Sequence, residues 1–206
     1  DGSFSTQSFT INVSDVDEFD VGAVTDSNAA ADTVAENATT GSTVGVTASA
    51  SDADATNNGI TYTLDDNAGG RFAINGTTGV VTVADGSLLD RETAASHGIV
   101  VRATSVDGSF TTQNFIIAVS DADEFDVGAV SDSNAGANTV AENAGNGSAV
   151  GITASATDAD ATDNGISYTL DDDAGGRFAI NGTTGVVTVA DGSLLDRETA
   201  ASHGIV

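Results

Sequence analysis

Residues 72–83 read FAINGTTGVVTV, two short apolar runs on either side of a polar segment. Phe72–Ile74 and Val80–Val83 consist largely of aromatic and β-branched residues, which suit pleated, half-buried surfaces. Residues 75–79 between them supply Asn, Gly and Thr, which favour turns. This stretch therefore predicts two β-strands joined by a turn.

Outward from this stretch, short alternating runs of apolar residues continue at residues 9–13, 60–64, 99–103 and 115–119. Such alternation is the period of a strand with one buried face, and Gly, Asn, Asp and Ser separate the runs. About seven strands in roughly 100 residues indicate an all-β fold of the antiparallel sandwich kind. The one helical hint, residues 87–93, predicts no more than a short turn.

A long internal repeat organises the chain. Residues 20–100 align without a gap with residues 126–206, and 11 of these 81 positions differ. DVDEF at residues 15–19 likewise returns as DADEF at residues 121–125. This period suits one independent domain per repeat. We therefore expect the last strand and linker of a preceding repeat at 1–19, a complete repeat at 20–125, and an incomplete repeat at 126–206 that lacks its last two strands.

The charge balance is strongly acidic, with 31 Asp and Glu against 5 Lys and Arg and a formal net charge of −26. Such a surface disfavours nucleic acid and anionic lipid, which bind through basic residues. The repulsion also needs an offset, and multivalent cations are the obvious one. The chain has no Cys, which excludes disulfides and thiolate metal sites. No apolar run is long enough to insert into a membrane.

Acidic residues gather at four loop positions between the strands of the first repeat. These are Glu36; Asp52 and Asp54, followed by Asn57 and Asn58; Asp90 and Glu92; and Asp121, Asp123 and Glu124. Calcium takes about 6–8 oxygen ligands, many of them carboxylates. Asp and Asn also fill ordinary turns, so any single position has that alternative. The recurrence of the whole set, with Asp-Ala-Asp present three times, favours calcium binding.

The order of these motifs resembles a cadherin repeat. EN at residues 36–37, DAD at 52–54, LDRE at 89–92 and DAD at 121–123 carry the resemblance, which covers residues 20–125 and as much of the second copy as exists. The chain is also similar to the bacterial cadherin-like repeats of large surface proteins. The resemblance implies tandem seven-stranded Greek-key sandwiches, an extracellular location, and calcium at the junction between successive domains.

The resemblance also implies which residues bind calcium. At the junction within the chain they are Glu36, Asp90 and Glu92 of the first repeat, Asp123 and Glu124 of the linker, the Ala122 carbonyl, and Asp158, Asp160 and either Asp163 or Asn164 of the second repeat. At the N-terminal end, Asp17 and Glu18 would face Asp52, Asp54 and Asn57 or Asn58. In the second repeat, Glu142, Asp196 and Glu198 correspond to Glu36, Asp90 and Glu92.

The sequence departs from the family pattern at three places, and these affect the number of calcium ions per junction. We expect two or three. The usual Pro before the EN motif is Ala35 or Ala141, and the linker reads D-x-D-E-F. A late-strand Asp ligand of the family is replaced by Ser105, so that ligand is missing unless Asp107 substitutes for it.

Catalytic interpretations have little support. The Ser-His pairs at Ser96-His97 and Ser202-His203 lack a Gly-x-Ser-x-Gly elbow, and the Gly-rich stretches lack a phosphate-binding Lys. A glycosidase carboxylate pair would not normally recur in every repeat of an array. The sequence therefore predicts a protein that is not an enzyme.

Three functions remain open. The first is a calcium-rigidified spacer or stalk in a bacterial surface adhesin, matrix or filament protein, which near-identical repeats favour. The second is direct, calcium-dependent adhesion between like repeats. The third is a polysaccharide-binding module, but the chain has no Trp, two Tyr and eight Phe. Both Tyr and most Phe are expected on core faces, which argues against that function.

The ends of the chain suggest one further possibility. Residues 1–14 nearly reproduce the last strand of a repeat, and residues 126–206 contain no such strand. The strand around Phe9, Ile11 and Val13 of a neighbouring copy could complete the second repeat by donor-strand complementation. The alternative is that the protein simply continues beyond these residues.

Overall fold

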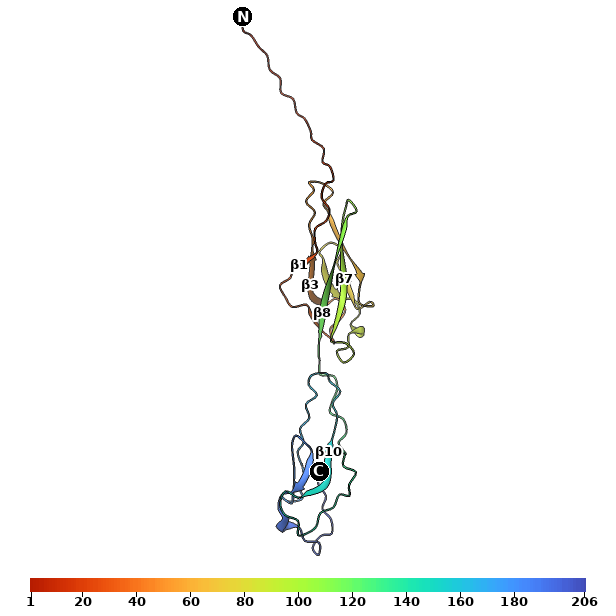
Figure 1. Ribbon diagram of the computed structural model, residues 1–206, viewed down its shortest axis with the longest axis vertical. Helices are drawn as coiled ribbons and strands as arrows, with labels where there is room; N and C mark the ends of the chain where they lie inside the picture. Colours follow the sequence, from red (N-terminus) through yellow and green to blue (C-terminus); the bar gives the residue numbers. More distant parts are fainter. The chain divides into compact units, whose positions relative to one another are not determined.

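The structure, a computed structural model, describes residues 1–206 and divides into two compact units, Asp1–Ala122 and Asp123–Val206 (Figure 1). Apart from two short 3-10 helices, all the regular secondary structure is β-strand, so the predicted all-β class is confirmed. The helical segments, η1 (Gly86–Leu88) and η2 (Gly192–Leu194), have three residues each, and neither could cross a membrane. The predicted short turn within residues 87–93 coincides with η1.

Unit 1 is a sandwich of two four-stranded sheets. One sheet has the order β1 (Thr25–Asp26), β3 (Thr43–Ser49), β6 (Val80–Val83) and β5 (Phe72–Ile74). The other has the order β2 (Thr33–Ala35), β8 (Phe110–Ser120), β7 (Ser96–Ser105) and β4 (Ile60–Asp66). The predicted antiparallel pairing holds for every pair in unit 1 except β2 with β8, which run parallel.

The core of unit 1 lies between these sheets and follows the alternation of the sequence. Val44 and Val46 of β3, Ile99 and Val101 of β7, and Ile117 of β8 are almost fully buried in one cluster. Successive side chains of a strand point to opposite faces, so each strand contributes every second residue to this cluster. The predicted strands at residues 60–64, 99–103 and 115–119 are all present.

The stretch at residues 72–83 forms the predicted hairpin of β5 and β6. Gly79 ends its turn with φ at 70°, in the left-handed region. A Cβ atom there would lie 2.1 Å from the Ala48 carbonyl oxygen of β3. The turn therefore needs glycine for both its backbone conformation and its close approach to the neighbouring strand.

Unit 2 forms only one of the two sheets. Its order is β11 (Phe178–Ile180), β12 (Val186–Val189), β10 (Ala149–Ser155) and β9 (Ser131–Asp132). Residues 139–141, 166–172 and 202–206, which correspond to β2, β4 and the start of β7, form no strands. In unit 1 these strands pair with β8 and with the rest of β7, and residues 126–206 contain no counterpart of either segment.

The expectations about apolar residues had two outcomes. The run at residues 9–13 lies outside the sheets and its side chains are exposed, so its place as the last strand of a preceding repeat stays a prediction. The expectation that most Phe side chains lie on core faces is wrong. Phe72 is buried, and Phe115 and Phe178 are partly buried, but the other five are exposed: Phe4, Phe9, Phe19, Phe110 and Phe125.

Candidate metal centre

A buried carboxylate, Glu36, organises one end of unit 1. It follows β2 directly and is only 5% exposed. Its Oε2 accepts a hydrogen bond from the Arg91 backbone N–H at 2.5 Å, and its Oε1 accepts one from the Ala122 N–H at 2.7 Å. Charge-assisted hydrogen bonds of this kind are what make a buried carboxylate tolerable. Glu36 thus draws together the loop after η1 and the segment that leaves β8.

Glu36, Asp90 and Glu92 form an acidic cluster at this end. Each offers one carboxylate oxygen, and these oxygens all lie within 4.8 Å of one another. Asp90 is fixed by hydrogen bonds from the Thr93 N–H and hydroxyl at 2.7 and 2.8 Å, and the hydroxyl contact is the main reason that its pKa is lowered. Asp90 is therefore held ionised. Hard oxygen donors at this spacing fit a calcium ion.

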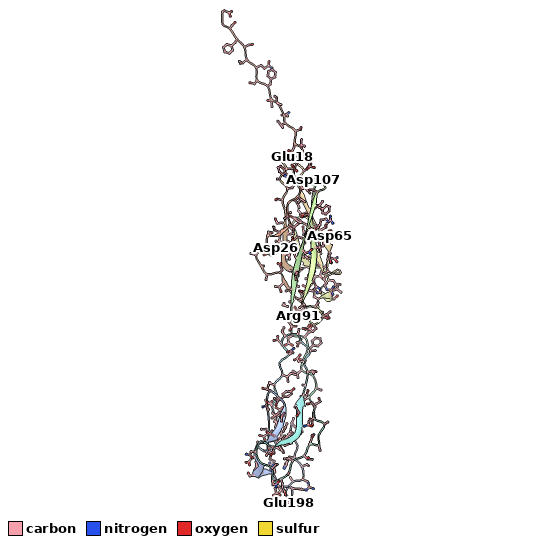
Figure 2. The ribbon with its side chains drawn as sticks, in the orientation of Figure 1. Glu18, Asp26, Asp65, Arg91, Asp107 and Glu198 are labelled. Atoms are coloured by element: carbon pink, nitrogen blue, oxygen red, sulfur yellow. The ribbon has the colours of Figure 1, made fainter.

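A second cluster lies at the opposite end of unit 1, where Figure 2 shows Glu18 and Asp107, far from Arg91. Oxygens of Asp17, Asp54 and Asp107 lie within 4.8 Å of one another. Asp54 is 4% exposed, and its two oxygens accept hydrogen bonds from the Glu18 and Phe19 N–H groups at 3.2 and 3.3 Å. Asp107, considered only as a substitute ligand, belongs to this cluster.

Ser105 has a role that the sequence reasoning missed. Its position was read as a lost ligand, but its hydroxyl donates a hydrogen bond to Asp52 Oδ2 at 2.5 Å. This contact is the main reason that the pKa of Asp52 is lowered. The Asn58 side-chain amide also donates to the Asp54 carbonyl at 2.7 Å. The sequence did offer a signal for this role, because Ser105 stands where the cadherin repeat pattern has an Asp ligand.

Like charges crowd this second cluster. The pKa of Asp17 is raised, first by burial and then by the charges of Asp107 and Asp54. The pKa of Glu18 is raised by burial and then by Asp54. Raised pKa values of neighbouring carboxyl groups mean that their full ionisation is unfavourable without a cation between them.

Unit 2 repeats this arrangement around Asp160, which is 2% exposed. Asp160 Oδ1 accepts from the Glu124 and Phe125 N–H groups at 3.3 and 3.4 Å, and Asp160 Oδ2 is buried with no hydrogen-bond partner. The pKa of Asp123 is raised, mainly by the Asp160 charge and by burial, and further by Asp158 and Asp163. Buried polar atoms are nearly always satisfied, so this oxygen points to an ion or water.

The remaining predicted ligands divide into two groups. Glu142, Asp196 and Glu198 of unit 2 lie within 4.8 Å of one another, as their counterparts do in unit 1. The roles of Asp121, the Ala122 carbonyl, Asn57 and Asn164 as ligands stay predictions. The residues at all these positions offer carboxylate, amide and carbonyl oxygens, and this donor set fits calcium better than zinc.

Known proteins are similar to this chain in sequence and in fold. The sequence profile of the cadherin domain matches residues 32–120. Human protocadherin Fat 1 is 34% identical over 209 residues, which cover 98% of this chain and 4% of that protein. The chain thus spans only a small fraction of this relative's length.

Solved structures agree on the fold. Mouse cadherin-23 EC22-24 superposes with a TM-score of 0.65 at 26% identity, over 86% of this chain and 56% of that chain. The protocadherin gammaB7 EC3-6 cis-dimer structure gives a TM-score of 0.74 at 21% identity, over 90% of this chain and 46% of that chain, which shows the fold alone. None of these relatives supports the bacterial setting expected from the sequence. Together with the sandwich fold, the matches place residues 32–120 of this chain in the cadherin domain family.

Proposed function

We propose that the chain is a calcium-rigidified spacer of a large extracellular protein, and that it acts as a structural module rather than an enzyme. The single observation that carries this proposal is Asp160. It is a buried carboxylate with one unpartnered oxygen, and its charge is the main reason that the pKa of the neighbouring Asp123 is raised. A divalent cation satisfies the orphaned oxygen and offsets the crowded charge at the same time.

The proposed junction combines acids on both sides of the linker. Glu36, Asp90 and Glu92 would bind from the first repeat, and Asp158, Asp160 and Asp163 from the second. Residues 121–124 of the linker would supply the rest. Glu36 accepts a hydrogen bond from the Ala122 N–H and Asp160 accepts one from the Glu124 N–H, so both ends of the linker are hydrogen-bonded to proposed ligands. We propose two or three calcium ions per junction.

Calcium would act mainly on the linker. Each ion adds about 2.7 kcal/mol to the free energy of unfolding when free calcium is about 100 times the dissociation constant. It adds about 1 kcal/mol when free calcium is only a few times the dissociation constant. Two such sites rival the net stability of a small domain. Without calcium, the carboxylates repel one another and the linker bends freely. With calcium, successive repeats are fixed against each other.

A spacer function fits the near-identity of the repeats, because length does not require different binding faces. Only 11 of 81 aligned positions differ between the two copies. The complete absence of Cys fits a surface protein that uses calcium in place of disulfides. On this basis we retain a bacterial adhesin, matrix or filament protein as the proposed setting.

Small-angle scattering of the two-repeat chain tests this proposal. In calcium we expect a larger maximum dimension and a narrow range of interdomain distances. In chelator at matched ionic strength we expect a smaller average dimension and a broader distribution. Identical profiles in the two conditions would contradict the spacer function.

A second candidate is calcium-dependent association between like repeats. It is favoured by Phe110 and Ile116 of β8, which are 57% and 69% exposed on the outer face of unit 1. Sedimentation of the chain with Ile116→Asp distinguishes it from the spacer. A calcium-dependent dimer that this substitution abolishes would support adhesion.

A further inference from the structure

The two tyrosines of the chain make the same contact, one in each repeat. The Tyr62 hydroxyl accepts a hydrogen bond from the Ala50 N–H at 2.9 Å, and the Tyr168 hydroxyl accepts one from the Ala156 N–H at 3.1 Å. Tyr62 is 8% exposed and belongs to the core cluster of unit 1. A buried Tyr hydroxyl normally has a hydrogen-bond partner, and the identity of that partner shows which segment the hydroxyl holds in place.

Ala50 lies where β3 leaves its sheet. Two positions earlier, the Ala48 N–H donates to the carbonyl of Gly79, in the turn of the β5–β6 hairpin, at 2.9 Å. Alternate N–H groups of an antiparallel strand point to the same side, so the Ala50 N–H lies beyond the start of β6 at Val80. The Tyr62 hydroxyl takes the place of a strand acceptor for this N–H, which would otherwise be costly to bury.

The backbone of Tyr62 is fixed by both sheets. Tyr62 pairs with Ala103 of β7 within its own sheet. Its N–H donates to the carbonyl of Gly76, in the β5–β6 turn of the other sheet, at 2.9 Å. Strand pairing, this turn contact and core packing together make the Tyr62 ring a rigid support for the segment that its hydroxyl binds.

That segment is the start of the loop at residues 51–59, which contains two proposed calcium ligands. Asp52 lies two residues after Ala50, and Asp54 lies four residues after it. The Ser51 carbonyl accepts from the Gly22 N–H at 2.8 Å, and Asp52 Oδ1 accepts from the Asp54 N–H at 3.1 Å. The positions of both carboxylates therefore depend on the direction in which the chain leaves Ala50.

The second repeat has the same arrangement around a different loop. The Ala154 N–H donates to the Gly185 carbonyl at 2.8 Å, and the Tyr168 N–H donates to the Gly182 carbonyl at 2.9 Å. The residues at positions 51, 57 and 61 are replaced by different ones at positions 157, 163 and 167. The hydroxyl contact is thus present in both repeats although the loops and their flanks differ.

The hydroxyl is what distinguishes these two side chains from Phe, which fills the core of unit 1 at Phe72. Burial of apolar surface at position 62 needs only the ring. The hydroxyl adds one hydrogen bond, and that bond goes to the loop rather than to the core.

We infer that Tyr62 and Tyr168 are positioning residues of the loops at residues 51–59 and 157–165, a role that rests on the proposed calcium binding. Each hydroxyl fixes the start of its loop before the ion binds, so the ion does not have to order the two Asp side chains. Order that is already present in the free protein increases affinity, because binding then costs less conformational entropy. Neither hydroxyl is a proposed ligand.

Tyr62→Phe and Tyr168→Phe in the 206-residue chain test this role, and each variant is the control of the other. Calcium titrations are followed by NMR on the amides of residues 52–58 and 158–164 in the same sample. We expect Tyr62→Phe to raise the calcium concentration for half-saturation at residues 52–58 by about 3- to 10-fold, the scale of one lost hydrogen bond. The change at residues 158–164 should stay below about 2-fold, as expected for a distant site. Tyr168→Phe should give the reverse pattern.

Hydrogen exchange in chelator separates positioning of the loop from general stability. The amides of residues 50–54 should exchange about 5-fold faster or more in Tyr62→Phe, because they open locally. Ile99→Val is the matched control, since it removes a methyl group from a core residue that is 1% exposed and lowers the stability of unit 1. Local exchange at residues 50–54 and calcium half-saturation at residues 52–58 should both keep their wild-type values in Ile99→Val.

Two results would overturn the positioning role while leaving the calcium sites in place. One is a wild-type half-saturation at residues 52–58 in Tyr62→Phe, and the other is an equal loss of affinity in Ile99→Val. A wild-type chain whose loop amides do not respond to millimolar calcium would instead overturn the proposed function, and the positioning role with it.

Discussion

At the scale of single residues, Asp54 and Asp160 each combine two tasks. Each is buried and accepts backbone hydrogen bonds that fix the chain entering its domain. Each also lies beside other acids of a candidate calcium site. A substitution that keeps the first task and removes the second separates them.

Asp160→Asn makes that separation. Asn retains an oxygen that accepts from the Glu124 and Phe125 N–H groups, but it removes one negative ligand. We expect calcium affinity at the junction to fall by about 10-fold or more, because ligand charge sets affinity in such sites. Isothermal titration calorimetry measures the change. Asp171→Asn, at an exposed position, removes the same charge and should leave affinity within about 2-fold. Equal affinities in the two variants would argue against Asp160 as a ligand.

Asp32 is a second residue that a substitution can test, and its counterpart in the second repeat serves as a control. Burial, and then the Asp26 carboxylate, raise its pKa above 3.8. The second repeat has Asn138 at this position, and Asn138 hydrogen bonds with Asp132. A raised folded-state pKa means that the ionised Asp32 costs stability at neutral pH. That cost disappears as the pH falls toward 3.8, where the side chain is protonated.

Asp32→Asn should therefore stabilise unit 1 at pH 7 by about 0.5–1 kcal/mol, the scale of a partly exposed charge pair. The gain should shrink as the pH falls. Thermal melting of wild type and variant at several pH values measures it. Asn138→Asp should have the opposite effect on unit 2. A gain that is independent of pH would show that charge repulsion is not its cause.

At the scale of elements, the sandwich rests on close approach between strands as well as on burial. In the β5–β6 turn, Gly79→Ala meets both the left-handed backbone and the Ala48 carbonyl. We expect a loss of about 3 kcal/mol in the free energy of unfolding of unit 1. Gly108→Ala is the matched control, because it has φ at 98° but open space around it. It should cost about 1–2 kcal/mol. Equal losses of the two variants in urea unfolding would show that the contact with the Ala48 carbonyl adds nothing to the cost at Gly79.

The elements also show what a sequence can and cannot predict here. The hairpin at residues 72–83 and the strands of β4, β7 and β8 were predictable, since alternation and turn residues are local signals. The parallel pairing of β2 with β8 was not, because it joins residues 85 positions apart, such as Val34 and Val119. The strand predicted at residues 9–13 depends in the same way on a partner, because alternation alone does not supply one.

The candidate site also has a part that the sequence predicts and a part that only the folded structure shows. The motifs identified the acids, because carboxylates recur at fixed loop positions of each repeat. The sequence did not reveal that Ser105 hydrogen bonds to Asp52 or that Asp107 joins Asp17 and Asp54. These contacts depend on where β7 ends relative to two other loops, which only the assembled sandwich fixes.

At the scale of the whole molecule, the net charge of −26 means that the proposed calcium binding should increase stability as well as stiffness. We expect about 10 mM calcium to raise the melting temperature by roughly 5–15 °C over chelator. Monovalent salt at the same ionic strength is the control, since it screens charge without binding the clusters. Differential scanning calorimetry measures both. An equal rise of the melting temperature in monovalent salt would show that calcium acts only by screening charge.

The central claim is that acids of successive repeats bind shared calcium, and diffraction from crystals grown in calcium tests it most directly. The account predicts anomalous peaks about 2.3–2.6 Å from carboxylate oxygens of Glu36, Asp90 and Glu92 and from Oδ2 of Asp160. A well-ordered map in which these side chains surround only water, at millimolar calcium, would contradict it.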